Sequence, residues 1–391
     1  MRDEAIELLK TMISIDSSNK FLIKGAPGSY EVLDFIREYM LGLDIETDYQ
    51  TVDDEHRNLK ASIPGSGNTE GTKGKPLTLY AHVDTVGYEL WSDRALEASV
   101  KDDRIIGLGS ADDKGHCAAM MLLAKRIKDE KVKLKGDLHL SFIDDEEGES
   151  RGSFDYVKKN APEACIVLES SPINNINVCH QGFGWLKITV HGKAGHGSAD
   201  GTSADAIARL AEIIVRMEKN KKENFAVNPH EMNGETVYHT GYIKGGTDFA
   251  SYPDYAELGI EIGTQPGETI DNRLNEIEGI FDEVRELYPD LDAKVEVVIA
   301  REPFTTSGSE YLCEITKNAI QTVSGMEAEC VGENSWGDAQ IFQDAGFPTL
   351  GIGADGGNLH APDEWLSLSS LEKLVDILMM IVKDYCGTEN D

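Results

Sequence analysis

The sequence predicts an α/β fold, a mostly parallel, helix-covered sheet that is interrupted by an inserted α+β unit. Three observations predict it. Short apolar runs alternate with amphipathic helical segments up to about residue 170, the pattern changes between residues 184 and 300, and the alternation then resumes. Short apolar runs between amphipathic helices are typical of parallel strands buried on both faces. We therefore expect a discontinuous domain of residues 1–180 and 300–391 and a continuous inserted domain of residues 181–299.

Each element of the discontinuous domain follows from hydrophobic periodicity. Apolar runs bounded by polar or glycine residues predict strands at 77–81, 138–143, 165–168 and 349–352. Helical spacing predicts helices at 1–10, 30–41, 116–129, 153–159, 310–323, 338–344 and 370–385. The Gly/Thr/Lys-rich segment 64–76 is expected to be a loop between two strands.

The inserted domain has its own order of elements. The predicted sequence is strand 185–191, helix 203–219, strands 237–243 and 256–262, helix 269–287 and strand 293–299. This β-α-β-β-α-β order is that of a ferredoxin-like unit.

Composition excludes several classes of protein. The 70 acidic residues outnumber the 37 basic ones and give a net charge of −33, which repels phosphate backbones and argues against nucleic acid. Most of this charge is expected to be a solvated surface. No apolar run is long enough to cross a bilayer, and the N-terminus lacks a signal-peptide pattern, so we expect a cytoplasmic protein without a membrane partner. Six scattered cysteines without a Cys-x-x-Cys pair are expected to be reduced core thiols: Cys117, Cys165, Cys179, Cys313, Cys330 and Cys386.

Metal-capable side chains follow the predicted parallel strands. They are His82 and Asp84 after 77–81, Glu146 and Glu147 after 138–143, Glu169 after 165–168, and His360 after 349–352. Open α/β sheets bind ligands at the carboxyl ends of their strands, so one fold rule gathers these residues. Imidazole and carboxylate without thiolate suit a catalytic zinc ion or a similar divalent ion.

Local spacing suggests how these residues divide their roles. Residues two apart on an extended segment share a face, so Asp84 can accept a proton from the ring of His82. The adjacent Glu146 and Glu147 point in different directions, so one can ligate metal while the other faces substrate. Taken singly, a satisfied core histidine and a solvated acidic turn are the simpler interpretations.

Other catalytic motifs are excluded. The Gly107–Gly115 segment is unlike a dinucleotide-binding turn, because Asp112 at the third glycine position would repel pyrophosphate. The sequence contains no P-loop, no G-x-S-x-G and no His-Glu-x-x-His. Neighbouring acids such as Glu146 and Glu147 also cannot face each other across a sugar, which argues against a glycosidase.

Five motifs in order carry a resemblance to a known family. They are the H-x-D of His82–Asp84, the G-x-G-x-x-D-x-K-G of Gly107–Gly115, the D-E-E of Asp145–Glu147, Glu169, and the H-x-x-x-E of His360–Glu364. Over essentially the whole chain the sequence resembles the zinc hydrolases that comprise aminoacylase, acetylornithine deacetylase, succinyl-diaminopimelate desuccinylase, glutamate carboxypeptidase and related di- and tripeptidases.

The resemblance implies a zinc-exopeptidase-like catalytic domain with an inserted lid and dimerisation domain, and two Zn²⁺ ions, with Co²⁺ or Mn²⁺ as substitutes. Asp112 would bridge the ions, with His82 and Glu169 on one and Glu147 and His360 on the other. It also implies a cis peptide after Asp112, Asp84 as a catalytic residue beside His82, and Glu146 as the general base.

The same resemblance concerns the inserted domain. Gly192–Ser198 matches the family's lid histidine motif, so His196 would hydrogen-bond the oxyanion, typically from the partner subunit of a homodimer. Ala250 and Gly263 stand where many members carry an Asn and an Arg that hold the substrate carboxylate. Either another cation substitutes, or the substrate lacks a carboxylate there; the candidate cations are Lys244, Arg273 and Arg301. Asp248 can contact an amine, although a loop aspartate is the simpler interpretation.

These features predict a metal-dependent amide hydrolase. The expected substrate is a small N-acyl amino acid. The alternatives are a di- or tripeptidase or carboxypeptidase of the same family, and, from a different class, an inactive metal-binding relic. The complete ligand set together with Glu146 and His196 argues against the relic.

Overall fold

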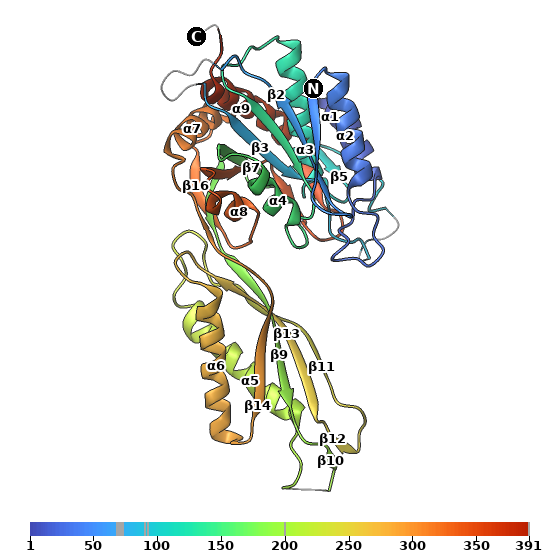
Figure 1. The fold of residues 1–391 in the computed structure, drawn as a ribbon, viewed down its shortest axis with the longest axis vertical. Coiled ribbons are helices and arrows are strands. Elements are labelled where there is room, and N and C mark those ends of the chain that lie inside the picture. Colours follow the sequence, from blue (N-terminus) through green and yellow to red (C-terminus); the bar gives the residue numbers. More distant parts are fainter. Residues whose placement is uncertain (68–73, 90, 92–93, 199–200, 390–391) are drawn as a thin grey trace. The chain divides into compact units, whose positions relative to one another are not determined.

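The computed structural model describes residues 1–67, 74–89, 91, 94–198 and 201–389 and divides into two compact units (Figure 1). The larger unit comprises Met1–Val178, Thr306–Cys330 and Asp338–Asp391; the smaller comprises Cys179–Thr305 and Val331–Gly337. The sequence placed 331–337 in the larger domain, whereas the structure groups this segment with the smaller unit. Of the loop expected at 64–76, residues 68–73 lie outside the described ranges.

The main sheet has a parallel centre. Its order is β1 (Glu46–Thr51), β2 (Arg57–Ile63), β6 (Leu138–Ile143), β3 (Leu77–His82), β7 (Ala164–Leu168), β17 (Thr349–Ile352), β8 (Asn175–His180) and β15 (Phe304–Thr305), and β16 (Glu329–Glu333) pairs with β8. The pairings β6–β3, β3–β7 and β7–β17 are parallel, and those of β1, β2 and β15 are antiparallel. The predicted fold class is therefore confirmed, with antiparallel strands at the edges.

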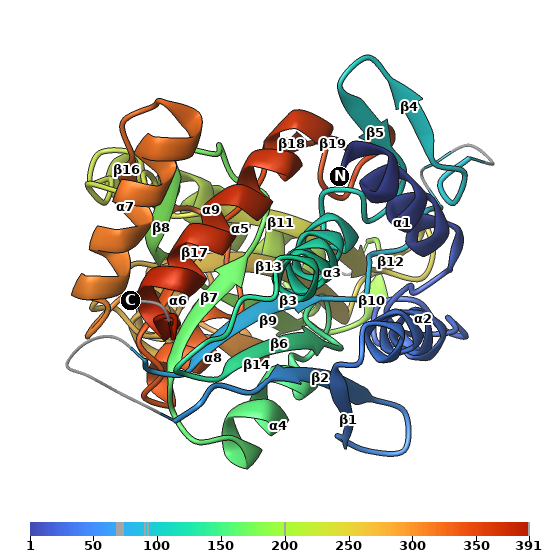
Figure 2. The ribbon, with the colours of Figure 1, turned by 90° about the horizontal axis from the view of Figure 1, so that it is seen from above.

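Helices cover both faces of this sheet, as Figure 2 shows from above. Leu79 of β3 belongs to a core that includes residues of α1 (Arg2–Ser14), α2 (Tyr30–Gly42), α3 (Lys114–Asp129), α7 (Glu310–Ser324) and α9 (Leu368–Cys386). The next residue, Tyr80, points the opposite way and meets Phe342 of α8 (Ala339–Asp344), which packs on Tyr156 of α4 (Arg151–Lys159). Alternate side chains of one strand thus anchor both helical layers.

A second, small sheet joins two distant loops of the larger unit. Its strands are β18 (Gly356–Gly357), β19 (Trp365–Ser367), β5 (Arg104–Ile106) and β4 (Ser99–Lys101), all antiparallel. The pairing of β19 with β5 holds the segment that carries His360 beside the segment that leads to Asp112. The sequence did not predict this sheet, because strands of two or three residues have no periodic signal.

The smaller unit has ferredoxin-like topology. Its elements are β9 (Gly182–His191), β10 (Gly195–His196), α5 (Ala206–Asn220), the short helix η1 (Lys221–Phe225), β11 (Tyr238–Gly245), β12 (Ser251–Tyr252), β13 (Tyr255–Thr264), α6 (Ile270–Leu287) and β14 (Asp292–Arg301). The antiparallel order β11-β13-β9-β14 is the one that a β-α-β-β-α-β unit adopts. Apolar residues of α5 and α6 pack with those of the sheet to form a separate core.

Among the described residues, none of the helices has the length and apolar character that a bilayer crossing requires.

Candidate metal centre

The parallel strands bring the predicted metal ligands to one edge of the sheet. His82 is the last residue of β3, Glu169 follows β7, and Glu147 lies in the turn after β6. These strands are neighbours in the order β6-β3-β7-β17, so their carboxyl ends meet at the same edge. His360 lies beyond β17 in the loop between β18 and β19.

Two groups of three ligands share Asp112. In the first, Nε2 of His82 lies 2.9 Å from Oδ1 of Asp112 and 3.5 Å from Oε1 of Glu169. In the second, Nε2 of His360 lies 3.1 Å from Oδ2 of Asp112 and 3.2 Å from Oε2 of Glu147. Within each group the ligand atoms lie within 4.8 Å of one another. Because each oxygen of Asp112 faces a different group, this carboxylate is placed to bridge two ions.

Glu364 shapes the loop that presents Asp112. Its carboxylate accepts backbone N–H bonds from Gly109 at 3.1 Å, Ala111 at 2.7 Å and Asp112 at 3.0 Å. Gly109 has φ +74°, and a Cβ there would lie 2.8 Å from the side chain of Thr85, so the turn requires glycine. The Asp112–Asp113 peptide is cis, as the resemblance implied.

Asp113 and His116 fix the backbone on which His82 stands. One carboxylate oxygen of Asp113 accepts the backbone N–H of His82 at 3.0 Å, and the other contacts Nδ1 of His116. Nε2 of His116 accepts the backbone N–H of Ala354 at 3.1 Å. All three side chains are buried, so this chain of contacts is protected from water.

Asp84 contacts His82 differently from the prediction. The nearest acceptor to Nδ1 of His82 is the backbone oxygen of Asp84 at 3.1 Å, whereas the carboxylate Oδ1 is 3.6 Å away. That carboxylate instead accepts the backbone N–H groups of Glu146 at 3.2 Å and Glu147 at 3.1 Å. Asp84 therefore fastens the Asp145–Glu147 turn to the end of β3 and leaves Nε2 of His82 facing the ligand group.

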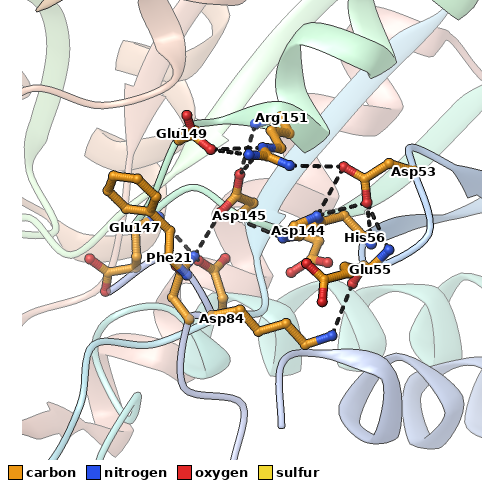
Figure 3. Close-up of polar contacts among 12 residues, drawn as sticks. Phe21, Asp53, Glu55, His56, Asp84, Asp144, Asp145, Glu147, Glu149 and Arg151 are labelled. Atoms are coloured by element: carbon orange, nitrogen blue, oxygen red, sulfur yellow. Dashed lines mark hydrogen bonds and ion pairs between the residues drawn. The ribbon is translucent and has the colours of Figure 1, made fainter. Parts of the chain in front are cut away.

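Asn19 holds Asp84, which is part of the polar network drawn in Figure 3, by a side-chain hydrogen bond. Its Nδ2 donates to Oδ2 of Asp84 at 2.8 Å and to Oδ1 of Asp145 at 2.9 Å, and its Oδ1 accepts the backbone N–H groups of Phe21 and Leu22. Asn19, Asp84 and Asp145 are all buried. An amide with two N–H bonds is the neutral group that can satisfy two buried carboxylates at once. Asn19 could not be predicted from the sequence, since an isolated asparagine gives no motif.

We expect Asn19→Ala to lower kcat by about 10- to 100-fold with little change in KM. The substitution removes the two hydrogen bonds by which Asn19 holds Asp84 and Asp145, and so loosens the turn that carries the candidate ligand Glu147. Steady-state kinetics at saturating metal checks this. The control is Asn174→Ala, which removes a half-buried asparagine of the same unit whose Nδ2 lies 3.5 Å from the carbonyl oxygen of Glu327, and it should change neither constant. Wild-type kcat in Asn19→Ala would show that Asp84 keeps its position without the amide.

The electrostatics of the centre suit divalent cations. Burial, together with the nearby carboxylates, raises the pKa values of Glu147 and Glu169. Hydrogen bonds to Asp112 and Glu147 raise the pKa of His360 to about 11. Oε1 of Glu147 is buried and has no hydrogen-bond partner. Concentrated negative charge, an orphaned carboxylate oxygen and an imidazole–carboxylate donor set without sulfur all fit two ions of the zinc, cobalt or manganese type.

Glu146 belongs to neither ligand group. Its backbone is held by Asp84, while its side chain lies in a region where burial and the carboxylates of Asp338 and Glu147 raise its pKa. Asp338 is itself fully buried and accepts a hydrogen bond from the hydroxyl of Tyr80 at 2.6 Å; Tyr80 lies in β3, two residues before His82. The sequence gives no sign that Asp338 lies beside Glu146, because only the fold brings it near β3.

His196 lies in the smaller unit. It pairs with Ser251 in the β10–β12 ladder, is exposed, and its Nδ1 lies 2.8 Å from the hydroxyl of Ser198. The neighbouring Asp248 accepts the backbone N–H groups of Ala250 at 2.7 Å and Ser251 at 2.9 Å. Asp248 thus acts as a loop aspartate that shapes the segment containing Ala250.

The three candidate cations, Lys244, Arg273 and Arg301, have different contacts in the structure. At Gly263 a Cβ would lie 2.4 Å from Oε1 of Gln181, and the Gly263 carbonyl accepts Nε of Arg273 at 2.8 Å. The guanidinium of Arg273 is buried and paired with Glu268 and Glu276, so it is committed to the fold. The remaining two are Arg301, which donates to the carbonyl of Ala300 at 3.0 Å, and Lys244, whose side chain is 71% exposed.

Two ligand groups joined by one carboxylate, at the carboxyl edge of a helix-covered parallel sheet, define a metal-dependent hydrolase centre. The chain matches the family model "Peptidase family M20/M25/M40" over residues 78–384, and it belongs to that family. It is accordingly a metal-dependent peptidase or amidohydrolase.

Relatives and solved structures are similar over nearly their whole length. An acetylornithine deacetylase of Aliivibrio salmonicida is 26% identical over 393 residues, 97% of this chain and 98% of that protein. A tripeptidase structure from Staphylococcus aureus has a TM-score of 0.79 at 18% identity and covers 98% of both chains. A dinuclear metal-binding M20 peptidase from Bacillus subtilis has a TM-score of 0.72 at 15% identity and covers 97% of both chains. At these identities the two structures establish the fold alone.

Proposed function

We propose that the chain hydrolyses the amide bond of small N-acyl amino acids, with two Zn²⁺ ions held by His82, Asp112, Glu147, Glu169 and His360. The main support for this proposal is the pair of ligand groups that share Asp112. Glu146 follows Asp145 in the same turn as Glu147 but belongs to neither group. Similarity in sequence to acetylornithine deacetylases favours an N-acyl substrate over an unblocked peptide.

The protein residues divide the chemistry among them. Two bound ions would polarise the scissile carbonyl and lower the pKa of the attacking water. Glu146 accepts a proton from that water on its carboxylate and then donates it to the leaving nitrogen. Asp84, which Asn19 holds, keeps the turn of Glu146 beside the end of the strand that carries His82. Glu364 fixes the loop of Asp112. His196 of the partner subunit would donate a hydrogen bond to the oxyanion, as the resemblance implies.

A substrate panel tests this function. The protein, loaded with zinc, cobalt or manganese, is incubated with N-acetyl amino acids and with unblocked di- and tripeptides, and the released amino acid is measured. We expect hydrolysis of the N-acetyl amino acids. Cleavage of unblocked peptides only would replace the deacylase by a peptidase. Absence of bound metal together with no turnover on any substrate would indicate the inactive relic.

We further propose a homodimer formed through the smaller unit. Strand β11 is at an edge of its sheet, and its residues after Tyr238 are exposed, with Ile243 55% exposed. Phe249, in the loop that follows, is fully exposed. An exposed apolar edge strand favours pairing with a second copy.

Ile243→Lys is expected to convert the dimer into a monomer, because a charge on an edge strand opposes edge-to-edge pairing. Size-exclusion chromatography with light scattering measures the mass. The matched control is Val298→Lys on the opposite edge strand β14, where the wild-type side chain is 59% exposed and the dimer should persist. A monomeric wild-type protein, or a dimer lost only in the β14 variant, would contradict this interface.

A further inference from the structure

Cys313 and Cys330 differ from the other cysteines of the chain. Their sulfur atoms lie 3.7 Å apart, Cys313 on α7 and Cys330 on β16, and both side chains are half-buried. The four others are fully buried and lie elsewhere: Cys117, Cys165, Cys179 and Cys386. The sequence grouped all six as core thiols, and the structure corrects this for Cys313 and Cys330. Seventeen positions separate the two in sequence, so only the fold makes them neighbours.

A cation stands beside this pair. Lys317 lies one helical turn after Cys313 on α7, and its pKa is raised by a hydrogen bond to the sulfur of Cys330 and by the proximity of both thiols. The thiolate is the reactive form of cysteine. Burial raises the pKa of Cys313 to about 11, so Cys313 stays a thiol at neutral pH. The two cysteines therefore have different roles available to them.

We propose that Cys313 and Cys330 are a site of reversible thiol oxidation that forms an intramolecular disulfide, with hydrogen peroxide as the oxidant. The Cys330 thiolate attacks one peroxide oxygen, breaks the O–O bond and becomes a sulfenic acid while the other oxygen leaves as water after taking up a proton. The sulfur of Cys313 then attacks the Cys330 sulfur and forms the S–S bond; the S–O bond of the sulfenic acid breaks, and its oxygen takes up the proton of Cys313 and leaves as a second water. In sum, two thiols and one peroxide give one disulfide and two waters, and an external thiol reverses the reaction.

The geometry requires a small movement. A disulfide needs its sulfur atoms roughly 1.6 Å closer than the 3.7 Å at which they stand, so the proposal requires a side-chain rotation of that size at Cys313 and Cys330. The bond would close a loop that contains the end of α7 and the start of β16, and so restrict the unfolded chain. The pair includes no metal ligand, so the proposal stands independently of the proposed function.

Peroxide titration of the full-length protein, followed by intact-mass spectrometry and peptide mapping, tests the site. We expect a loss of about two mass units, a cross-linked pair of peptides containing Cys313 and Cys330, and recovery of the starting mass with a thiol reductant. The four buried cysteines are internal controls and should stay reduced. The oxidised protein should also melt several degrees higher than the reduced one.

Single variants distinguish Cys330, which attacks the peroxide, from Cys313, which then forms the disulfide. In Cys313→Ser, dimedone should label a sulfenic acid at Cys330, whereas in Cys330→Ser it should label Cys313 at least about tenfold more slowly. Lys317→Met should slow disulfide formation without preventing it. Equal oxidation of buried and half-buried cysteines, or a mass increase in place of the loss in the wild-type protein, would overturn the proposal.

Discussion

Glu146→Gln is expected to lower kcat by about 10²- to 10⁴-fold on whichever amide substrate the panel identifies. The glutamine side chain keeps nearly the same shape but cannot take the proton from the attacking water. Glu146 belongs to neither ligand group, and its backbone N–H bond to Asp84 does not depend on the side chain. Metal content should therefore remain near that of the wild type, and the loss should appear in kcat and not in stability.

Glu149→Gln provides the matched control for this prediction. The change is chemically identical and lies three residues further along the same acidic segment, where the carboxylate pairs with the exposed Arg151. Activity of this variant should stay within about twofold of the wild type, because surface ion pairs contribute little. Retention of most activity by Glu146→Gln, with normal metal content, would mean that another group is the base.

The strand-end ligands were the part of the site that the sequence could predict. His82, Glu147 and Glu169 follow strands whose apolar character is clear, and the parallel order of those strands brings them to one edge. The shared position of Asp112 came from the resemblance, since no periodicity distinguishes a bridging carboxylate from an acidic helix start. The strand pattern thus predicted most of the set of residues, the resemblance implied their division into two groups, and the structure groups them in the same way.

The supporting contacts could not be predicted, because they join residues far apart in the chain. Asn19 meets Asp84 and Asp145 across 65 and 126 positions, and Glu364 meets the loop of Asp112 across more than 250. A single polar residue in a loop carries no pattern that names its distant partner. Arg273 is a second example of a contact that the sequence could not predict. Only the structure shows that its guanidinium forms ion pairs with two glutamates and is not free to bind a substrate.

Asp112→Asn is expected to weaken the binding of both ions, whereas a change in a ligand of one group should affect only one. Both oxygens of Asp112 face histidine nitrogens, Oδ1 that of His82 and Oδ2 that of His360, so the neutral amide removes an anionic ligand from each group at once. We expect at least about 100-fold weaker binding of each ion and loss of turnover. Zinc titration by calorimetry, with metal analysis of the dialysed protein, measures both affinities and stoichiometry.

Glu169→Gln, which changes a ligand of one group only, is the comparison variant for Asp112→Asn. Glu169 belongs to the first group alone, so this variant should retain the ion held by Asp112, Glu147 and His360, and its stoichiometry should fall from two ions to one. Far-UV circular dichroism of the metal-free forms checks that each variant keeps its fold. If Asp112→Asn bound two ions with wild-type affinity, or lost one while keeping the other unchanged, Asp112 would not be the bridge. The centre would then consist of two independent sites, and Glu146 would act beside only one of them.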